Sequence, residues 1–586
     1  MLHFHSASPQ YLPREASIFS VGRSVWIATA LLVCSLTLGA CGGGSSNTSN
    51  AIAASGSPAE SQATTVSPVG GGVAAGQTAS ALGNLADAAS RDTKAPELDP
   101  GCPIRYSANL ANEQIGPDPL LNKQWHLKNT GQFQGKVGED LNVERAWTIS
   151  QGEGVRIALV DDALEVVHSD LKANVVAGQS YNYRPAVKGS SFPLPCNYDD
   201  SHGTSVAGII ASRGSNAIGT VGIAPKAQLV GYNALALDLT ADIADALNRD
   251  MATNAIYNNS WGSPDDGVLN AAEPEFEAAI QKGLRLGRQG KGSIFVFPAG
   301  NGGCYQVSGS IACQKDNSNL DGYVNQLGII TVGAVNQLGR LPWYGERGSN
   351  ILVSAPAGDG AAGITTTAIS NAYRSDFAGT SASAPMASGV IALMLGVNPK
   401  LTWRDVPIIL ARSARKNDIN DPEWAGLFNH KYGFGVIDAT AAVRMASTWA
   451  SVGDTRSLKR CDISSEEFAA IADGGEALKN TLNLKDCAIT AIEYVKVAVK
   501  IDHEYSGDLQ IDLVAPSGSL SNFSTPRLCA SSERSSNQCG SLAQWSFGSV
   551  RHLDEPATGD WRLAVQDRVI GKSGHLQAWS LTVYGR

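Results

Sequence analysis

Five short apolar runs alternate with helical patterns between residues 155 and 395. The runs lie at 155–160, 228–232, 293–297, 328–332 and 351–354, and the helical patterns at 203–212, 274–290 and 381–395. Short continuous apolar runs are typical of strands that are buried on both faces of a parallel sheet. Strands that alternate with helices therefore predict a doubly wound α/β domain, which we place at residues 102–450.

The C-terminal part of the chain has a different periodicity. Apolar side chains alternate there with polar or small ones, at 495–501, 509–513, 561–565 and 579–583. A period of two residues is typical of strands with one buried face. A chain of 586 residues is also too long for one hydrophobic core. We therefore expect a second, all-β domain, an antiparallel sandwich, over residues 455–586.

The N-terminal residues have the pattern of an export signal. Arg14 and Arg23 precede an apolar run at 25–40, which is short for a membrane span but has the length of a signal peptide. The run ends in Leu-Gly-Ala before Cys41, which resembles the bacterial lipoprotein signal, where this cysteine is lipidated and becomes the first mature residue. Such a lipid anchors a protein without threading it through the membrane. An uncleaved anchor and a soluble secreted product are the alternatives.

The residues around this cysteine also predict a location. Residues 1–41 form the predicted signal segment, and residues 42–101, rich in Gly, Ser, Ala and Thr, form a flexible tether. Gly42 rather than an aspartate follows Cys41, and the resemblance then implies the outer membrane. We expect a protein of the bacterial cell envelope, lipid-anchored at the outer membrane or secreted.

Charge and cysteine content exclude some functions. A net charge of −9 provides no global basic surface, so we expect no nucleic-acid partner. Eight cysteines follow Cys41, none of them in CxxC spacing, and this argues against zinc. An even number in an exported chain favours disulfides, although eight cysteines allow 105 connectivities. Short loops favour Cys304–Cys313, Cys461–Cys487 and Cys529–Cys539, which leaves Cys102–Cys196.

Three polar residues stand where predicted strands end or predicted helices begin. Asp161 follows the first apolar run, and His202 and Ser381 each stand at the start of a helix. In an open α/β sheet, the carboxyl ends of the strands form the functional crevice. A serine becomes a nucleophile when a histidine removes its proton and a buried carboxylate orients that histidine. The order Asp, His, Ser is the subtilisin order, so the sequence predicts a serine hydrolase.

The motifs around these residues resemble one family. In order along the chain they are Gln-Trp-His-Leu at 124–127, Val-Asp-Asp at 160–162, His-Gly-Thr at 202–204, Gly-Thr-Ser-Ala-Ser-Ala-Pro at 379–385 and Leu-Thr-Trp-Arg-Asp at 401–405. From about residue 118 to the end, the chain resembles the kexin/furin proprotein convertases, which carry a subtilisin-like catalytic domain and a C-terminal P domain. The resemblance implies that Ser381 is the nucleophile, His202 the base and Asp161 its orienting carboxylate. Asn301 would donate to the oxyanion.

The resemblance also implies a preference for basic substrates. Convertases cut after paired basic residues, which subsite carboxylates hold by charge-assisted hydrogen bonds. Asp265 and Asp321 match the positions that bind the residue before the scissile bond, and Asp162 and Asp199 match those for the preceding residue. Tyr323 also matches a pocket residue. The alternative is that these acids are ordinary solvated loop residues.

Two calcium sites are implied in the same way, because Ca²⁺ requires several oxygen ligands. The first would take the side chains of Asp118, Asp170 and Asn216, with the carbonyls of Arg213, Ile218 and Thr220 from one loop. The second would take Asp265, Asp316 and Glu346, beneath the specificity pocket. Both rest on the resemblance, and ordinary surface acids are the alternative.

Some residues depart from the family pattern. Ala163 stands where the family has glycine, and an insertion that contains two cysteines lies between Asn301 and Asp316. Ala271 stands where furin has an acid, so an arginine four residues before the cut should matter less. A tether occupies the place of the usual inhibitory pro-domain, so we expect folding to need a separate chaperone, or none.

We therefore predict a lipid-anchored, calcium-dependent serine endopeptidase that acts on polypeptides with paired basic sites. A broad-specificity degradative subtilase is one alternative, and cleavage after apolar residues would indicate it. A catalytically silent surface adhesin is another, but the triad residues are all present in the sequence.

Overall fold

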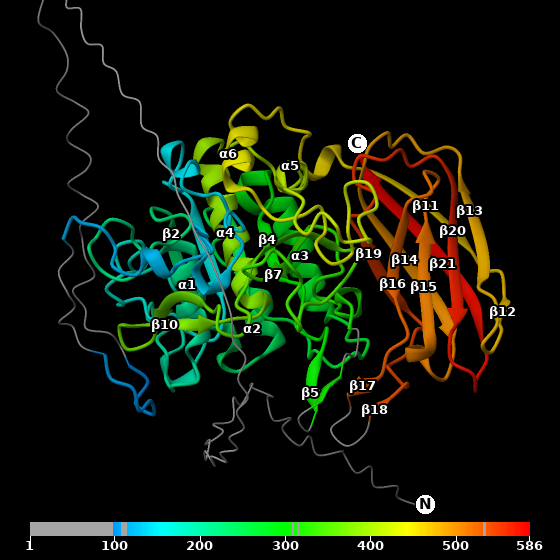
Figure 1. The fold of residues 1–586 in the computed structure, drawn as a ribbon, viewed down its shortest axis with the longest axis horizontal. Helices are drawn as coiled ribbons and strands as arrows, with labels where there is room; N and C mark the ends of the chain where they lie inside the picture. Colours follow the sequence, from blue (N-terminus) through cyan, green and yellow to red (C-terminus); the bar gives the residue numbers. More distant parts are fainter. Residues whose placement is uncertain (1–97, 107–113, 308–309, 313–315, 531–534) are drawn as a thin grey trace, which may run out of the picture. The chain divides into compact units, whose positions relative to one another are not determined.

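The computed structural model describes residues 98–106, 114–307, 310–312, 316–530 and 535–586 (Figure 1). All of the described residues belong to one compact unit. The predicted signal segment, Cys41 and the tether up to residue 97 lie outside the described residues.

Six parallel strands form the central sheet of the α/β domain, in the order β2-β1-β3-β4-β7-β8. Their bounds are β1 Arg156–Val160, β2 Gln228–Tyr232, β3 Ile256–Asn259, β4 Ile294–Pro298, β7 Ile329–Val335 and β8 Ile351–Pro356. The predicted α/β fold with a parallel sheet is confirmed. We did not predict β3, because its last two residues are asparagines. Both are fully buried, and Asn258 accepts a hydrogen bond from Ser388 Oγ at 2.8 Å.

Six helices accompany this sheet: α1 His202–Ala211, α2 Thr240–Ala246, α3 Pro274–Leu286, α4 Thr380–Val397, α5 Asp405–Ser413 and α6 Ala439–Ser447. Helix α4 packs against β3, β4, β7 and β8 and is almost entirely buried. It is the one helix in the described ranges that is long and apolar enough to span a membrane, but burial in the protein identifies it as a core helix. The predicted helix 274–290 is shorter than expected. It ends at Leu286, because Arg288 and Gln289 have left-handed backbone angles.

Two pairs of short strands complete this domain. Strands β5 Tyr305–Val307 and β6 Ser310–Ala312 form one antiparallel hairpin within the predicted insertion, and β9 Ile364–Ala368 and β10 Ala372–Phe377 form another. The second hairpin leads directly into α4, which begins after Gly379 at φ 82°. That positive φ favours glycine at this position.

The C-terminal domain contains two antiparallel sheets. One has the order β11-β21-β14-β19, with β12 paired to β21, and the other has the order β13-β20-β15-β16. Their bounds are β11 Lys459–Ser465, β12 Ala469–Ile471, β13 Leu478–Leu484, β14 Ile492–Asp502, β15 Leu509–Val514, β16 Leu520–Ser524, β19 Trp545–Ser549, β20 Gly559–Asp567 and β21 Gly574–Gly585. The short strands β17 Cys529–Ala530 and β18 Ser535–Ser536 pair with each other. In β20 alternate residues are buried, whereas β1 is buried at every position after its first, as the two sequence periodicities predicted.

The described cysteines are consistent with the expected disulfides. Cys102–Cys196, Cys461–Cys487 and Cys529–Cys539 are bonded, which confirms three of the predicted pairs. Cys304 is also disulfide-bonded, and its predicted partner Cys313 lies outside the described residues.

Candidate active site

The carboxyl edge of the central sheet brings Asp161 and His202 together. Asp161 directly follows β1 and is 2% exposed, and His202 is the first residue of α1. Nδ1 of His202 donates to Oδ1 of Asp161 at 2.8 Å. This bond fixes the imidazole tautomer, so the other ring nitrogen, Nε2, is the one available to accept a proton.

The electrostatics of this pair favour the protonated imidazole. Burial alone would lower the pKa of His202, but the nearby Asp161 and then Asp162 carboxylates raise it above its ordinary value of 6.5. The ring lies against Phe377, with 5.4 Å between the ring centroids, and 34% of its side chain remains exposed. The imidazole is therefore oriented, partly accessible and strongly basic.

Ser381 is the second residue of α4, so the helix start presents its hydroxyl at the same sheet edge. Its Oγ donates to the carbonyl oxygen of Ser260 at 3.1 Å, and no hydrogen bond joins it to His202 within the described part of the chain. Catalytic hydrogen bonds of this kind are often long before substrate binds. Sequence reasoning did not identify the Ser260 contact.

Asn301 follows β4 and lies beside the start of α4. Its Oδ1 accepts from the backbone N–H of Thr380 at 2.8 Å and from the Thr380 hydroxyl at 3.0 Å. Because the amide group is planar, these two bonds direct Nδ2 away from Thr380. The start of α4 thus positions both the serine hydroxyl and the amide of Asn301.

Asp162 has a role that its predicted subsite assignment did not include. One oxygen, Oδ2, accepts from the backbone N–H of His202 at 2.9 Å, and Oδ1 accepts from Gly203 at 2.8 Å and from Ala163. These bonds satisfy donors at the start of α1 that no helical carbonyl can reach. Burial, and then the charge of Asp161, raise the pKa of Asp162 to about 7.

Four carboxylates line one small cavity below the carboxyl ends of β3 and β4. They belong to Asp265, Asp316, Asp321 and Glu346, and none forms an ion pair with a lysine or arginine in the described ranges. Burial raises the pKa of each, to about 7 for Asp316, to about 6 for Asp321 and well above the ordinary value for Glu346. The buried Arg527 guanidinium lowers the pKa of Asp316 in part, but the carboxyls outnumber it, so a cation that bound here would stabilise their charged form.

Each of these carboxylates is held by backbone donors. Asp321 accepts from the N–H of Ser263 at 3.0 Å and from that of Tyr323 at 2.7 Å. Asp265 accepts from Asn301, Asp316 from Gly267 and Glu346 from Gly302. Gly300 is required beside them, because a Cβ there would lie 2.2 Å from Glu346 Oε1, and its φ is 107°.

The remaining predicted subsite residues lie in varied surroundings. The Tyr323 hydroxyl donates to Glu273 at 2.7 Å, and its ring packs edge-on against Trp261 and Phe276. Asp199 is exposed in the loop that precedes α1. Asp245, on α2, accepts from the Tyr183 hydroxyl and forms an ion pair with Arg249, so its charge is already compensated.

The first predicted calcium site has a donor set that fits a hard cation. Asp118 and Asp170 are buried without an ion pair in the described chain, and the Asn216 amide donates to Asp170 at 2.9 Å. In the loop at residues 213–220, the carbonyls of Ser215, Asn216 and Gly219 accept backbone hydrogen bonds. The carbonyls predicted as ligands are those of Arg213, Ile218 and Thr220. By contrast, these three carbonyls accept no hydrogen bond from another described residue. Two unpaired carboxylates and three free carbonyls are ligands that Ca²⁺ prefers.

The second predicted site, at Asp265, Asp316 and Glu346, also consists of oxygen donors without an ion-pair partner in the described chain. A tighter cluster of ligand-type atoms, mutually within 4.8 Å, occurs among the described residues at Asp99, Cys102 and Cys196. Those two cysteines form a disulfide, so they offer no thiolate to a metal. The carboxylate set around Glu346 is thus the better candidate for a cation.

The C-terminal domain holds the segment that carries Asp316 and Asp321. The indole Nε1 of Trp545 donates to the Asn319 carbonyl at 3.3 Å, and Gly548 N–H donates to Asn319 Oδ1 at 2.7 Å. Leu320 belongs to the hydrophobic core of the C-terminal domain. The buried Arg527 donates to the carbonyl of Gly267, next to Asp316. The sequence analysis did not predict that contacts from the C-terminal domain support this pocket.

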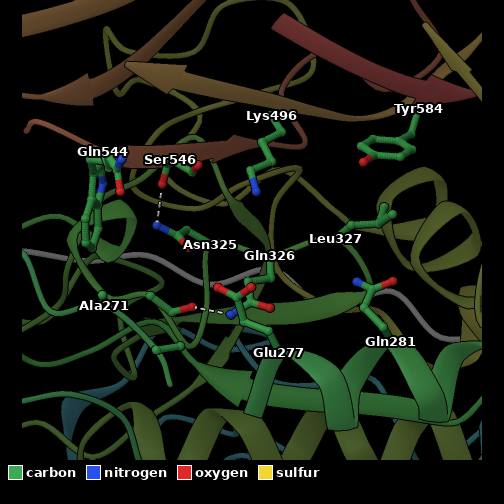
Figure 2. A pocket seen from close by; sticks show the side chains of 13 residues that line it. Ala271, Glu277, Gln281, Asn325, Gln326, Leu327, Lys496, Gln544, Ser546 and Tyr584 are labelled. Carbon is green, nitrogen blue, oxygen red and sulfur yellow. Dashed lines mark hydrogen bonds between the residues drawn. The ribbon is translucent and has the colours of Figure 1, made fainter. Parts of the chain in front are cut away.

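A second cavity, of about 180 Å³, lies beside this junction (Figure 2). Figure 2 shows Lys496 and Tyr584 of the C-terminal domain on one side and Glu277 and Gln281 of α3 on the other. Asn325 crosses the junction and donates to the Ser546 carbonyl at 2.8 Å. Ala271, where furin has an acid, lies on the wall of this cavity.

Comparison with known proteins assigns both domains. Residues 152–435 match the model described as Subtilase family, and residues 492–583 match the one described as Proprotein convertase P-domain. The chain is 36% identical over 486 residues to the dibasic-processing endoprotease of Schizosaccharomyces pombe. The matched region covers 80% of this chain and 65% of that protein. It is 34% identical over 485 residues to kexin of Saccharomyces cerevisiae, covering 80% and 56%. The chain thus spans somewhat less than two thirds of the length of these curated relatives.

A solved structure shows the same two-domain arrangement of folds. The serine protease of Aeromonas sobria, solved in complex with a chaperone, matches with a TM-score of 0.70 and 27% identity, over 83% of this chain and 100% of that one. Residues 152–435 of this chain therefore match the Subtilase family and have the fold of a subtilisin-like α/β domain, and residues 492–583 match the proprotein convertase P domain.

Proposed function

We propose that the protein is a serine endopeptidase that cleaves polypeptides after basic residues, preferably paired ones, through an acyl-enzyme intermediate. The observation that carries this proposal is the cavity of four carboxylates without an ion-pair partner among the described residues, which adjoins Asn301 and, through it, the start of α4. The relatives named as a dibasic-processing endoprotease and as kexin support it.

The chemistry follows from the positions of four side chains. His202 Nε2 takes the proton of Ser381 Oγ as this oxygen attacks the scissile carbonyl, and Asp161 stabilises the imidazolium that forms. The amide of Asn301 donates to the developing oxyanion, which is worth about 3–4 kcal/mol for such a donor. His202 then protonates the leaving amine, and water releases the acyl group by the reverse sequence.

Substrate selection would use the charge of the same sheet edge. Asp265 and Asp321 would bind the cationic side chain before the scissile bond, and Tyr323 would flank that subsite. Asp162 and Asp199 would bind the preceding basic residue. Of these two, Asp199 is the more exposed, and its interaction should be correspondingly weaker.

Calcium would be held at the two oxygen-rich sites described above. When bound, the ion supplies positive charge that compensates buried carboxylates, and it takes no part in proton transfer. Asp118, Asp170, Asn216 and the loop carbonyls would hold one ion. Asp265, Asp316 and Glu346 would hold the other, so this second site would fix the pocket.

We further propose that Cys41 is lipidated and that the protein resides in the bacterial cell envelope, at the outer membrane. The motif at residues 25–41 supports this. We also propose that folding uses a separate chaperone, since a structural relative has been solved in complex with one.

The direct test is cleavage of matched peptides with Arg-Arg, Ala-Arg or Arg-Ala before the scissile bond. The paired-basic proposal predicts that Arg-Arg is cut fastest, Ala-Arg more slowly and Arg-Ala hardly at all. Equal cleavage of all three would favour a degradative subtilase instead. Failure of the protein to react with an active-site serine reagent would favour the silent adhesin.

A further inference from the structure

A cavity of about 320 Å³ opens at the amino-terminal edge of the central sheet. Arg156, the first residue of β1, lies on its wall, whereas Asp161 follows the other end of the same strand. A strand of this length separates the two ends by roughly 16 Å. The cavity is thus distinct from the active site, and nothing in the proposed peptidase mechanism uses it.

Three cationic side chains line this cavity: Arg156, Arg288 and Lys291. None of them forms an ion pair with a carboxylate in the part of the chain that the structure describes. The one carboxylate on the wall, that of Glu153, is already engaged. It pairs with Lys226 at 3.3 Å and accepts from the Gln151 N–H at 2.9 Å. The cavity therefore carries a net positive charge.

Arg288 is the most unusual of the three, because it is only 6% exposed. Its guanidinium donates to the carbonyls of Gly292 and Pro399, at 3.4 and 3.5 Å, which are long contacts with neutral acceptors. Burial lowers the pKa of Arg288 to about 10, so it remains charged at neutral pH. The buried Asp405 carboxylate compensates the Arg288 charge only in part, because the two groups form no direct ion pair. A buried charge without a direct ion-pair partner is unfavourable, and Pro399 itself lies on the cavity wall.

The backbone around Arg288 is also unfavourable by itself. Arg288 and Gln289 have φ of 49° and 59°, so two successive residues with side chains adopt left-handed angles. Such angles disfavour every residue except glycine. Arg156 adds a second underused donor, since its Nε is buried and has no hydrogen-bond partner. Two guanidinium groups with unsatisfied hydrogen-bonding capacity, one from β1 and one from the turn after α3, therefore line one cavity.

We propose that this cavity binds a small tetrahedral oxyanion, a sulfate or phosphate group. Guanidinium groups match the geometry of such oxygens, and an ammonium adds a point charge. The group could come from a free anion or from the head of a phospholipid, because both present the same oxygens. The structural alternative is that Arg288 only ties the turn 287–292 to the chain after α4.

Calorimetric titration of the full chain with sodium sulfate against matched sodium chloride tests the proposal. Sulfate is the better probe, because phosphate would remove calcium. Wild type should show saturable binding. The double variant Arg156→Gln/Lys291→Gln should bind at least tenfold more weakly, while Lys282→Gln/Arg285→Gln, which removes one lysine and one arginine from the exposed face of α3, should bind like wild type.

Titration with glycerophosphate separates the two sources. Binding at least tenfold tighter than that of sulfate would indicate a phospholipid headgroup, and equal or weaker binding a free anion. Both results support the site. A heat of sulfate binding that does not saturate, or equal sulfate binding by both double variants, would overturn the proposed site. Peptide cleavage by the Arg156→Gln/Lys291→Gln variant should equal that of wild type, so loss of the site and loss of the proposed peptidase activity are distinguishable.

Discussion

The triad and the acidic pocket lie along the same sheet edge, but different parts of the chain hold them. Asp161, His202 and Ser381 take their positions from β1, α1 and α4, all within the subtilase domain. The segment that carries Asp316 and Asp321 is held from the other side by the P domain, through Trp545 and Gly548. Catalysis and recognition should therefore respond differently to damage in the P domain.

The two regions also differ in how their charges are compensated. In the triad, the Asp161 carboxylate faces an imidazole that it can stabilise as a cation. In the pocket, four carboxylates face one another, and burial raises the pKa of each. We therefore expect the pocket to depend on an added cation, from the substrate or from calcium, whereas the Asp161–His202 pair supplies its own counter-charge.

Removal of the nucleophile should have the largest effect and should leave recognition intact. We expect Ser381→Ala to lower kcat by about 10⁶-fold, as loss of one member of a cooperating triad does. Ser383→Ala is a matched control in the same helix, since Ser383 only donates to the Ala355 and Pro356 carbonyls. Single-turnover kinetics of both variants measure the difference. Substantial cleavage by a folded Ser381→Ala protein would contradict the assignment.

Removal of a pocket charge should have the next largest effect. A desolvated ion pair left half-made costs about 3–5 kcal/mol, so Asp321→Asn should lower kcat/KM for cleavage after arginine by about 10²–10³-fold or more. Asp199→Asn should instead reduce only the preference at the preceding position. Kinetics on the Arg-Arg and Ala-Arg peptides distinguish the two variants. Equal losses on both peptides in both variants would show that the subsites are not separate.

Calcium removal should weaken the pocket more than the triad. Each ion present at 100 times its Kd contributes about 2.7 kcal/mol, so chelation of both ions should lower Tm by roughly 5–7 °C in a folded part of this size. Glu346→Gln should reduce catalysis more than Asn216→Ala, because only the Glu346 site adjoins the pocket. Calorimetry and rate measurements across a calcium titration test both statements. Unchanged Tm and rate after exhaustive chelation would refute them.

A P-domain change should affect binding rather than chemistry. Trp545→Phe removes the indole hydrogen bond to the Asn319 carbonyl and should raise KM for arginine substrates by up to about tenfold, since one hydrogen bond contributes about 0.5–1.5 kcal/mol. Trp561→Phe is the matched control, because its indole donates to Ala557 inside the P domain. Both variants should retain kcat. A raised KM in both, or a lowered kcat in Trp545→Phe alone, would contradict the comparison.

The sequence predicted the fold and the proposed chemistry more fully than the contacts that hold the site residues in place. Apolar runs that end at polar residues are visible in any α/β chain, so the sheet and the positions of Asp161, His202 and Ser381 followed from pattern and motif. The sequence analysis did not predict β3, because the two asparagines at its end are typical of a turn. The end of α3 was predicted too late in the chain, because no sequence pattern indicates the left-handed backbone angles of Arg288 and Gln289.

The contacts between domains could not be predicted for a different reason. The bonds from Trp545 and Gly548 to Asn319 join residues more than 200 positions apart, and no local periodicity encodes such a pairing. The double role of Asp162 was hidden in the same way. A motif places it beside Asp161, but only the path of the chain shows that it caps the helix that begins with His202.

The smallest expected effect concerns the charge around His202. Only the neutral imidazole can accept the Ser381 proton, so kcat/KM should rise with pH through the pKa of His202, which the Asp161 and Asp162 carboxylates hold above 6.5. Asp162→Asn removes one of these charges and should move this limb to lower pH, by about one unit or less. Its amide oxygen can keep the bonds from Gly203 and Ala163, whereas the bond from the His202 N–H is lost. Asp200→Asn is the control, because Asp200 pairs with Arg184. A limb that stays in place in Asp162→Asn, or that moves equally in both variants, would show that Asp162 does not act on the base.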